Sequence, residues 1–259
     1  MQFDKHKQAC REFKSIDRNR PNYLVVHYSC ESFYDRTDGK TPRITSIAVR
    51  SFSSGQTDSF SIHKTAEKMH VDFLKIEEKY DELEKQMLTE FFDFVKEHKS
   101  NMWLHWNMRD INYGFQAIEH RFEVLGGKPE VLSESKKVDL ARLFVQKYGV
   151  RYAPNPRLQS LIKLNHIEPL GFLNGAEEAA AFDTKDYIKL HQSTLRKVDV
   201  IANLLDRAIE NSLKTNATWK DSYGLSLQGI FEYFKSCWWL QLIAWAFSLL
   251  LGFLLGRIQ

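Results

Sequence analysis

The stretch NYLVVHYSCESF, residues 22–33, decides the fold. It is rich in aromatic and β-branched residues, a composition typical of a β-strand. A second such run, RITSIAVRSF at residues 43–52, follows a polar loop, and the turn SSGQ leads on to TDSFSIHK at residues 57–64. These three runs predict three strands, and the Ser-Gly turn predicts that the last two form an antiparallel hairpin.

The chain around these strands has mainly helical patterns. Residues 4–18 carry apolar side chains at helical spacing and predict a leading helix within residues 1–21, and residues 72–99 predict a long one. MWLHW, residues 102–106, predicts a fourth strand. Further helices are expected over RDINYGFQAIEHRFEVLGG, KKVDLARLFVQKYG, NPRLQSLIKLNHI and residues 176–209, with a break near 183–185.

This order of elements predicts the fold class. Strands followed by a long helix, another strand and more helices indicate an α/β domain with a mixed sheet covered by helices on both faces. The predicted domain covers residues 22–213. The 259 residues, 43% of them hydrophobic, are sufficient for one well-packed domain.

Charge and cysteine content limit the function. Lys and Arg together number 36 and Asp and Glu 33, so any nucleic-acid surface must be a local basic patch. Such a surface requires that basic residues far apart in the sequence lie close together in the folded chain. The three cysteines are far apart without a C-x-x-C pair, which argues against a disulfide framework and a zinc site. With no signal-peptide pattern at the N-terminus, a reducing cytoplasm is expected. The basic candidates are Arg18, Arg20, Lys136, Lys137, Arg151, Arg157, Arg196 and Lys197.

A second hydrophobic stretch, CWWLQLIAWAFSLLLGFLL at residues 237–255, contains no charged residue. A helix of this length spans roughly 28 Å, close to the thickness of a bilayer core. Trp238, Trp239 and Arg257 near its ends are typical of the two membrane interfaces. We therefore expect a single-pass C-terminal membrane anchor, with the preceding domain in the cytoplasm. The alternative is a buried core helix.

The segments beside and within this helix suggest two further features. Residues 214–236 are polar and contain Gly, Ser and Thr, so they are expected to form a tether between domain and membrane. Gly252 and Gly256 form a small-xxx-small pair that would allow two such helices to associate as a homodimer.

Several local motifs resemble the DEDD-type 3′-to-5′ exonucleases of the ribonuclease H-like superfamily. S-C-E at residues 29–31 lies where that family has D-x-E, and I-T-S-I-A at residues 44–48 resembles its second strand. H-W-N-M-R-D at residues 105–110 resembles its motif before the next helix, and RLQSLIKLNHI resembles its leucine-rich helix. The resemblance covers residues 22–213 and implies a ribonuclease H-like fold that acts on nucleic acid.

The same resemblance implies a metal site. In that family four carboxylates hold two Mg²⁺ or Mn²⁺ ions, which activate a water and stabilise the leaving oxygen of a phosphodiester. The corresponding residues here are Glu31, Asp110 and Asp199, which are therefore the catalytic and metal-ligating candidates. The first family aspartate falls on Ser29, which is neutral.

The general base of the family is a His or Tyr four or five residues before the last aspartate. Here those positions are Leu195 and Thr194. An alternative alignment places the last aspartate at Asp183, with Glu178 on the same helix. Both alignments lack the first aspartate and the base.

Each candidate carboxylate also has a structural interpretation. The structural interpretation of Glu31 is a solvated strand end, and that of Asp110 is the N-terminal residue of a helix. Asp199 is placed to form an ion pair with Arg196 or Lys197 on its own helix.

Three functions stay open at this point. The first is a membrane-anchored, exonuclease-like protein that hydrolyses or binds nucleic acid with Mg²⁺ or Mn²⁺. The second is a catalytically inactive exonuclease-fold module that binds a partner or acts as an adaptor at the membrane. The third is an effector of a bacterial defence system, in which residues 237–255 act on the membrane.

Overall fold

The computed structural model describes residues 2–31 and 41–256, and between 251 and 256 it describes the side chain of Phe253 alone. Within these residues, five strands form one mixed sheet in the order β3-β2-β1-β4-β5. β1 is antiparallel to β2, which is antiparallel to β3, whereas β4 is parallel to β1 and to β5. The strands are β1 (Tyr23–Cys30), β2 (Ile44–Ser51), β3 (Thr57–Ser61), β4 (Met102–His105) and β5 (Lys137–Asp139).

The α-helices precede, separate and follow these strands along the chain. They are α1 (Gln2–Arg18), α2 (Ile62–Lys68), α3 (Tyr80–Glu97), α4 (Phe115–Val124), α5 (Leu140–Tyr148), α6 (Arg157–Leu164), α7 (Gly175–Asp183), α8 (Tyr187–Ile209), α9 (Trp219–Tyr223), α10 (Leu227–Ser236) and α11 (Trp238–Gly256).

The α/β class, the mixed sheet and the β2–β3 hairpin are confirmed. The sequence interpretation was wrong about β5, because residues 137–139 were assigned to the start of a helix. It also extended the third strand to residue 64, whereas α2 already begins at Ile62. In both places a strand runs directly into a helix. At β5 the helical pattern covered the strand, whereas at β3 the strand pattern continued into the first residues of α2.

The chain forms two compact units. The larger contains the sheet and comprises the described residues of Phe13–Leu143 and Asn155–Lys214. The smaller comprises those of Met1–Glu12, Phe144–Pro154 and Thr215–Gln259. Most of the domain predicted over residues 22–213 therefore lies in the larger unit, and residues 144–154 belong to the smaller.

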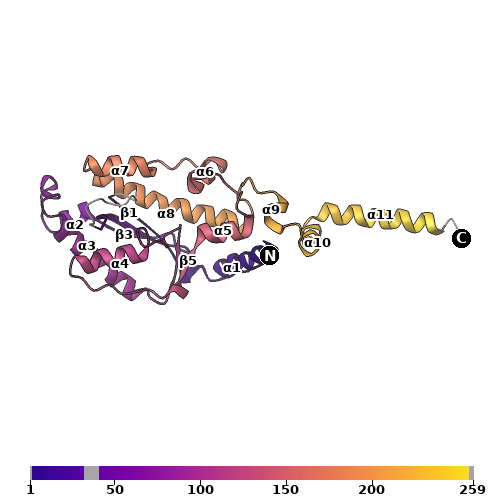
Figure 1. The fold of residues 1–259 in the computed structure, drawn as a ribbon, viewed down its shortest axis with the longest axis horizontal. Coiled ribbons are helices and arrows are strands. Elements are labelled where there is room, and N and C mark those ends of the chain that lie inside the picture. Colours follow the sequence, from indigo (N-terminus) through magenta and orange to yellow (C-terminus); the bar gives the residue numbers. More distant parts are fainter. Residues whose placement is uncertain (1, 32–40, 257–259) are drawn as a thin grey trace. The chain divides into compact units, whose positions relative to one another are not determined.

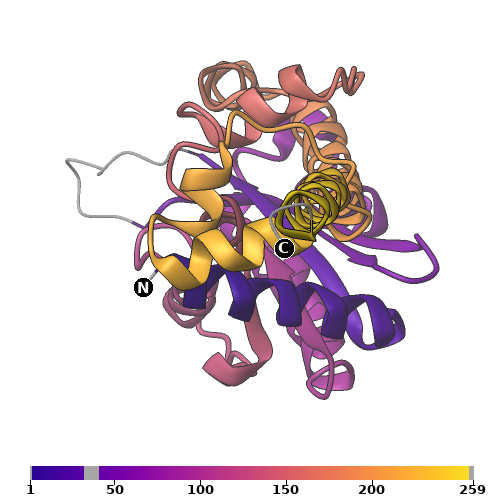
Figure 2. The same ribbon diagram turned by 90° about the vertical axis from the view of Figure 1, so that its right-hand side faces the viewer.

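The middle of the sheet is covered on both faces. Every residue of β1 is buried, as expected for a central strand between two layers of helices. Leu24, Val26 and Tyr28 share a hydrophobic core with side chains of α3 and α4. The alternate residues of β1 point to the opposite face, where α8 packs across β1 and β2. Figure 1 shows α7 and α8 on one side of the strands and α3 and α4 on the other, and Figure 2 gives the turned view.

The predicted tether, residues 214–236, contains two short helices. α9 begins with a capping box, in which Thr218 accepts from the N–H of Asp221 and the Asp221 carboxylate accepts from the N–H of Thr218. α10 follows after the turn at Gly224 and has Ser226 as its N-cap. The segment is therefore largely helical.

α11 lies within the predicted anchor. Among residues with described side chains, no helix is both long and apolar enough to cross a membrane. In α11 those side chains are residues 238–250 and Phe253, whereas the predicted span is residues 237–255. The anchor stays a prediction from the sequence. The predicted dimer contact of Gly252 and Gly256 lies outside the described side chains.

Candidate functional site

Glu31 follows β1 directly and is held by an arginine. Nη2 of Arg43 lies 3.2 Å from Oε1 of Glu31, and Nη1 of Arg43 lies 2.6 Å from Oε1 of Glu77. The guanidinium also lies over the rings of Tyr80 and Phe182, at 4.6 and 4.9 Å from their centroids. Burial alone would lower the pKa of Arg43, but the hydrogen bonds to Glu77 and Glu31 raise it above its ordinary value. Glu31 is thus a paired carboxylate.

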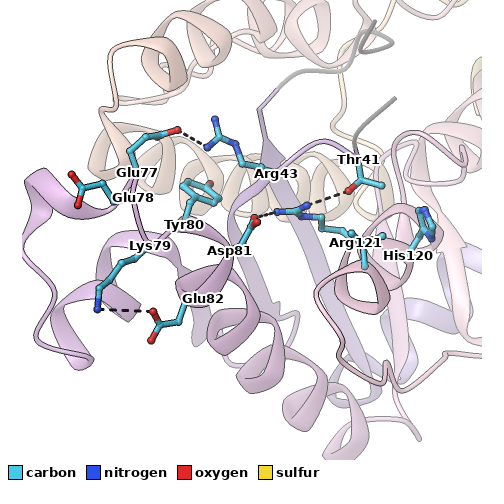
Figure 3. Close-up of a pocket in the computed structure, with 11 residues that line it drawn as sticks. Thr41, Arg43, Glu77, Glu78, Lys79, Tyr80, Asp81, Glu82, His120 and Arg121 are labelled. Carbon is cyan, nitrogen blue, oxygen red and sulfur yellow. Dashed lines mark hydrogen bonds and ion pairs between the residues drawn. The ribbon is translucent and has the colours of Figure 1, made fainter. Parts of the chain in front are cut away.

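Arg43 also borders a polar pocket of about 810 Å³ (Figure 3). Arg121 lines the same pocket and is ion-paired with Asp81 at 2.6 Å. The third cation among the described residues that line the pocket is Lys79, which lies 4.0 Å from Glu82. Each of these three cations, among the lining residues that the structure describes, already has a carboxylate partner.

Asp110 lies in the exposed turn between β4 and α4. Its Oδ1 accepts from the N–H of Asn112 at 2.8 Å, and its own N–H donates to the carbonyl of Tyr113 at 3.2 Å. The alternative in which Asp110 is the first residue of a helix is wrong, because α4 begins at Phe115. The Asp110 side chain instead closes a local turn, a common competitor of helix formation.

Asp199 lies on α8 and is shared by two arginines. Its Oδ1 lies 3.1 Å from Nη1 of Arg50 on β2, and its Oδ2 lies 3.4 Å from Nη1 of Arg196. The structural alternative, an ion pair with Arg196, is therefore present, and Arg50 adds a second partner.

The structure does not bring the three candidate carboxylates together. Glu31, Asp110 and Asp199 each make separate local interactions, as described above. Within residues 2–31 and 41–256, no group of three or more His, Cys, Asp or Glu side chains is arranged to hold a metal ion.

A different set of polar side chains surrounds Ser29. The Ser29 hydroxyl donates to Oε1 of Glu178 at 2.9 Å and lies 2.8 Å from Oγ1 of Thr194. Ser193 donates to the same oxygen of Glu178 at 3.0 Å, and Ser46 lies 2.5 Å from Oγ1 of Thr194. These hydroxyls come from β1, β2 and α8, and all of them are buried.

Glu178 has a cationic partner inside the same cluster. Nζ of Lys197 on α8 lies 2.6 Å from Oε2 of Glu178, and the two residues are 6% and 2% exposed. We call Ser29, Ser46, Glu178, Ser193, Thr194 and Lys197 the Ser29 cluster. His27, two residues before Ser29 on the same face of β1, is also buried. Burial, and then the charge of Lys197, lower its pKa well below the ordinary value, so the imidazole is neutral.

The Ser29 cluster does not fit Mg²⁺ or Mn²⁺. These ions prefer several oxygen ligands with negative charge, and two-metal sites use several carboxylates. The cluster contains the single carboxylate of Glu178, which the ammonium of Lys197 already neutralises. A divalent ion beside Oε2 would meet this ammonium at close range and be repelled.

The sequence reasoning missed four members of this cluster, and two of them, Ser46 and Ser193, were not singled out at all. Glu178 appeared only in the alternative alignment, and Lys197 only as a surface base or a partner of Asp199. One signal was available: Lys197 falls on the same stripe of α8 as Leu190, Thr194 and Ile201, all of which are buried. A lysine within an apolar stripe at helical spacing indicates a buried partner.

No protein-family model and no curated protein matches the chain. Among solved structures, the chain is similar to the family B DNA polymerase from the hyperthermophilic archaeon Pyrobaculum calidifontis, with a TM-score of 0.47 and 13% sequence identity. The match covers 78% of this chain and 28% of the polymerase chain. The present chain thus corresponds to little more than a quarter of that protein.

Proposed function

We propose that this chain is an exonuclease-like module that binds nucleic acid without hydrolysing it and is held at a membrane by residues 237–255. The observation that carries the proposal is the buried ion pair between Lys197 and Glu178 beside Ser29. It occupies the face of β1 on which the resemblance expects the first metal-binding aspartate.

The fold supports the exonuclease-like part of this proposal. The resemblance over residues 22–213 implies a mixed sheet with strands β1, β2 and β3 followed by a helix and a further strand. The antiparallel pairing of β1, β2 and β3 and the parallel pairing of β1 with β4 agree with that order. We therefore assign the larger unit to the ribonuclease H-like fold as part of the proposal.

The chemistry of the Ser29 cluster supports the loss of hydrolysis. A metal ion would supply an open coordination position for a water and a second charge for the leaving oxygen. The ammonium of Lys197 supplies a single charge and no coordination position. Every residue of the cluster is at most 6% exposed, so a phosphodiester and its attacking water do not reach it.

Nucleic acid as the ligand rests on the resemblance. At least five of the eight basic candidates are ion-paired with carboxylates, which reduces the charge available to phosphates. Any binding should therefore depend only weakly on salt, because few phosphate contacts release few counterions. The five are Arg20, Lys137, Arg151, Arg196 and Lys197, with Asp206, Glu134, Asp221, Asp199 and Glu178 as their respective partners.

The test uses the full chain in detergent, with Mn²⁺ titrated by calorimetry and labelled single-stranded DNA and RNA followed by anisotropy and by gel. We expect strand binding with a shallow salt slope, no saturable Mn²⁺ binding and no shortening of the strands. Mn²⁺-dependent shortening that is lost in Asp110→Asn and kept in Asp93→Asn would overturn the proposal. It would instead support hydrolysis through Glu31, Asp110 and Asp199. Asp93 is an exposed residue of α3 and serves as the matched control.

If neither the DNA nor the RNA strand binds, only the nucleic-acid part of the proposal is overturned. A protein partner then becomes the next hypothesis. The membrane part has its own measurement, flotation with liposomes before and after deletion of residues 237–255. Flotation that is unchanged by the deletion would show that these residues are not the anchor.

A further inference from the structure

A cysteine and a histidine lie one turn apart on α1 in the smaller unit. Sγ of Cys10 lies 3.5 Å from Nε2 of His6, and the two residues are four positions apart, so they share one face of the helix. Cys10 as a whole is partly exposed.

The ring of His6 is oriented by a backbone carbonyl. Its Nδ1 lies 2.6 Å from the carbonyl oxygen of Lys147. Because a carbonyl oxygen accepts and cannot donate, Nδ1 carries a proton in this contact, and Nε2 of the neutral ring is the acceptor that faces Cys10. The ring also packs against Tyr223, with 4.4 Å between the centroids.

Two groups beside the sulfur act on its thiolate form, the ring of His6 and the ammonium of Lys147. Burial lowers the pKa of His6, and the hydrogen bond to the carbonyl of Lys147 opposes this effect. Burial lowers the pKa of Lys147, while attraction to Cys10 raises it, which identifies this ammonium as a cation close to the sulfur. Burial, and then Cys10, raise the pKa of Tyr148, so its phenol is neutral. Asp221 is paired with Arg151 at 2.6 Å and is thus already neutralised. A base and a cation beside a cysteine are the features that lower a thiol pKa.

The other two cysteines lack this environment. Cys30 is buried in the core of the larger unit. Cys237 is partly exposed, and its sulfur lies 3.9 Å from the hydroxyl of Ser236. Cys237 is the first residue of the proposed membrane anchor, so an unstructured cysteine-containing peptide in solution is the reference thiol.

We propose that Cys10 is a reactive thiol, activated by His6 and Lys147, and that it is a site of oxidation by peroxides. The thiol proton moves to Nε2 of His6, and the sulfur attacks one oxygen of the peroxide. An S–O bond forms as the O–O bond breaks, and the leaving oxygen takes the proton from the imidazolium. Cys10 is oxidised by two electrons to a sulfenic acid, while the peroxide is reduced to water or an alcohol.

The first arm measures thiol reactivity on the full chain. Iodoacetamide labelling is followed for each cysteine by mass spectrometry from pH 5 to 9. Because the thiolate fraction changes tenfold per pKa unit, a pKa one unit below the ordinary value gives Cys10 about a tenfold faster reaction than the reference peptide at pH 6.5. His6→Gln and Lys147→Met should each reduce this ratio, and Lys7→Gln, an exposed position on α1, should not.

The second arm exposes the protein to hydrogen peroxide and traps sulfenic acid with dimedone. We expect dimedone on Cys10, with loss of the signal in Cys10→Ser. If Lys147→Met does not fold, as judged by circular dichroism, His6→Gln alone decides the test. Labelling of Cys10 no faster than the reference peptide at every pH would overturn the activation. Fast labelling without a dimedone adduct would overturn the peroxide chemistry. Neither arm depends on the nucleic-acid proposal.

Discussion

The hydroxyl of Ser29 on β1 donates to Glu178 on α7 across 2.9 Å, although 149 residues separate them in the chain. Glu178 is in turn paired with Lys197 on α8. One buried carboxylate therefore connects the central strand with two helices of the covering layer. A cluster of this kind is stabilising only when every polar atom has a partner, so its members should respond strongly to substitution.

Removing the cation of this pair should be costly. Lys197→Met leaves Glu178 as a buried charge without its partner, and we expect a loss of about 3 to 5 kcal/mol in the free energy of unfolding. Urea denaturation measures this loss. Lys189→Met, an exposed position on the same helix, should change it by less than about 0.5 kcal/mol. The double variant Glu178→Met with Lys197→Met should be more stable than Lys197→Met alone, and the reverse order would show that the two residues are not coupled.

Replacing the hydroxyl of Ser29 by a carboxylate tests whether the Ser29 cluster derives from a metal site that has lost its ligands. Ser29→Asp combined with Lys197→Ser places two carboxylates side by side without the ammonium. Their repulsion should destabilise the fold, and Mn²⁺ should restore it, because a ligand that binds only the folded state stabilises it by about 2.7 kcal/mol at 100 times its Kd. Thermal unfolding with and without Mn²⁺ gives the answer. A midpoint that Mn²⁺ does not raise would argue against a metal-site origin.

Acid should destabilise the larger unit through His191. Burial, then the charges of Lys64 and His63, lower the pKa of His191 to about 3. In the unfolded chain this group takes up a proton near pH 6.5, while in the folded chain it stays neutral, so stability is lost as the pH falls below about 6.5. The loss from His191 should reach about 2 kcal/mol at pH 5. Denaturation at pH 7.5 and pH 5 should show it, and His191→Gln should flatten the difference. An equal pH dependence in the variant would contradict this source.

A second buried ion pair should behave like the first. Nη2 of Arg121 on α4 lies 2.6 Å from Oε2 of Glu84 on α3, and Glu84 is fully buried. Burial raises the pKa of Glu84, and the hydrogen bond from Arg121 opposes this effect. Arg121→Met should therefore cost about 3 to 5 kcal/mol, whereas Arg142→Met on the exposed side of α5 should be nearly neutral. Similar unfolding midpoints for both variants would contradict the prediction.

The sequence predicted the layers of the fold better than the ends of its elements. Alternating and helical patterns are properties of neighbouring residues, so the strands around Ser29 and the helix at residues 187–209 could be recognised. The starts of α3 and α4 could not, because Asp72 and Asp110 each accept from the N–H two residues later and close a turn instead. β5, at three residues, is too short to show a period.

The site was less predictable because it depends on contacts between distant segments. The sequence indicated carboxylates at Glu31, Asp110 and Asp199, but their partners are set by tertiary packing. Arg43 and Glu31 meet across neighbouring strand ends, and Asp199 meets Arg50 of β2. Lysine is usually a surface residue, and Lys197 is buried here because α7 places Glu178 beside it.

The same arrangement has a consequence during protein synthesis. Thr194, which closes the polar side of β1 and β2, is made 165 residues after Ser29. At typical translation rates this interval is roughly 10 to 30 seconds, during which α8 cannot yet cover the emerging strands. The uncovered face then carries the hydroxyls of Ser29 and Ser46, which water can solvate. A nascent sheet of this kind should attract fewer aggregation partners on the ribosome than one with an entirely apolar face.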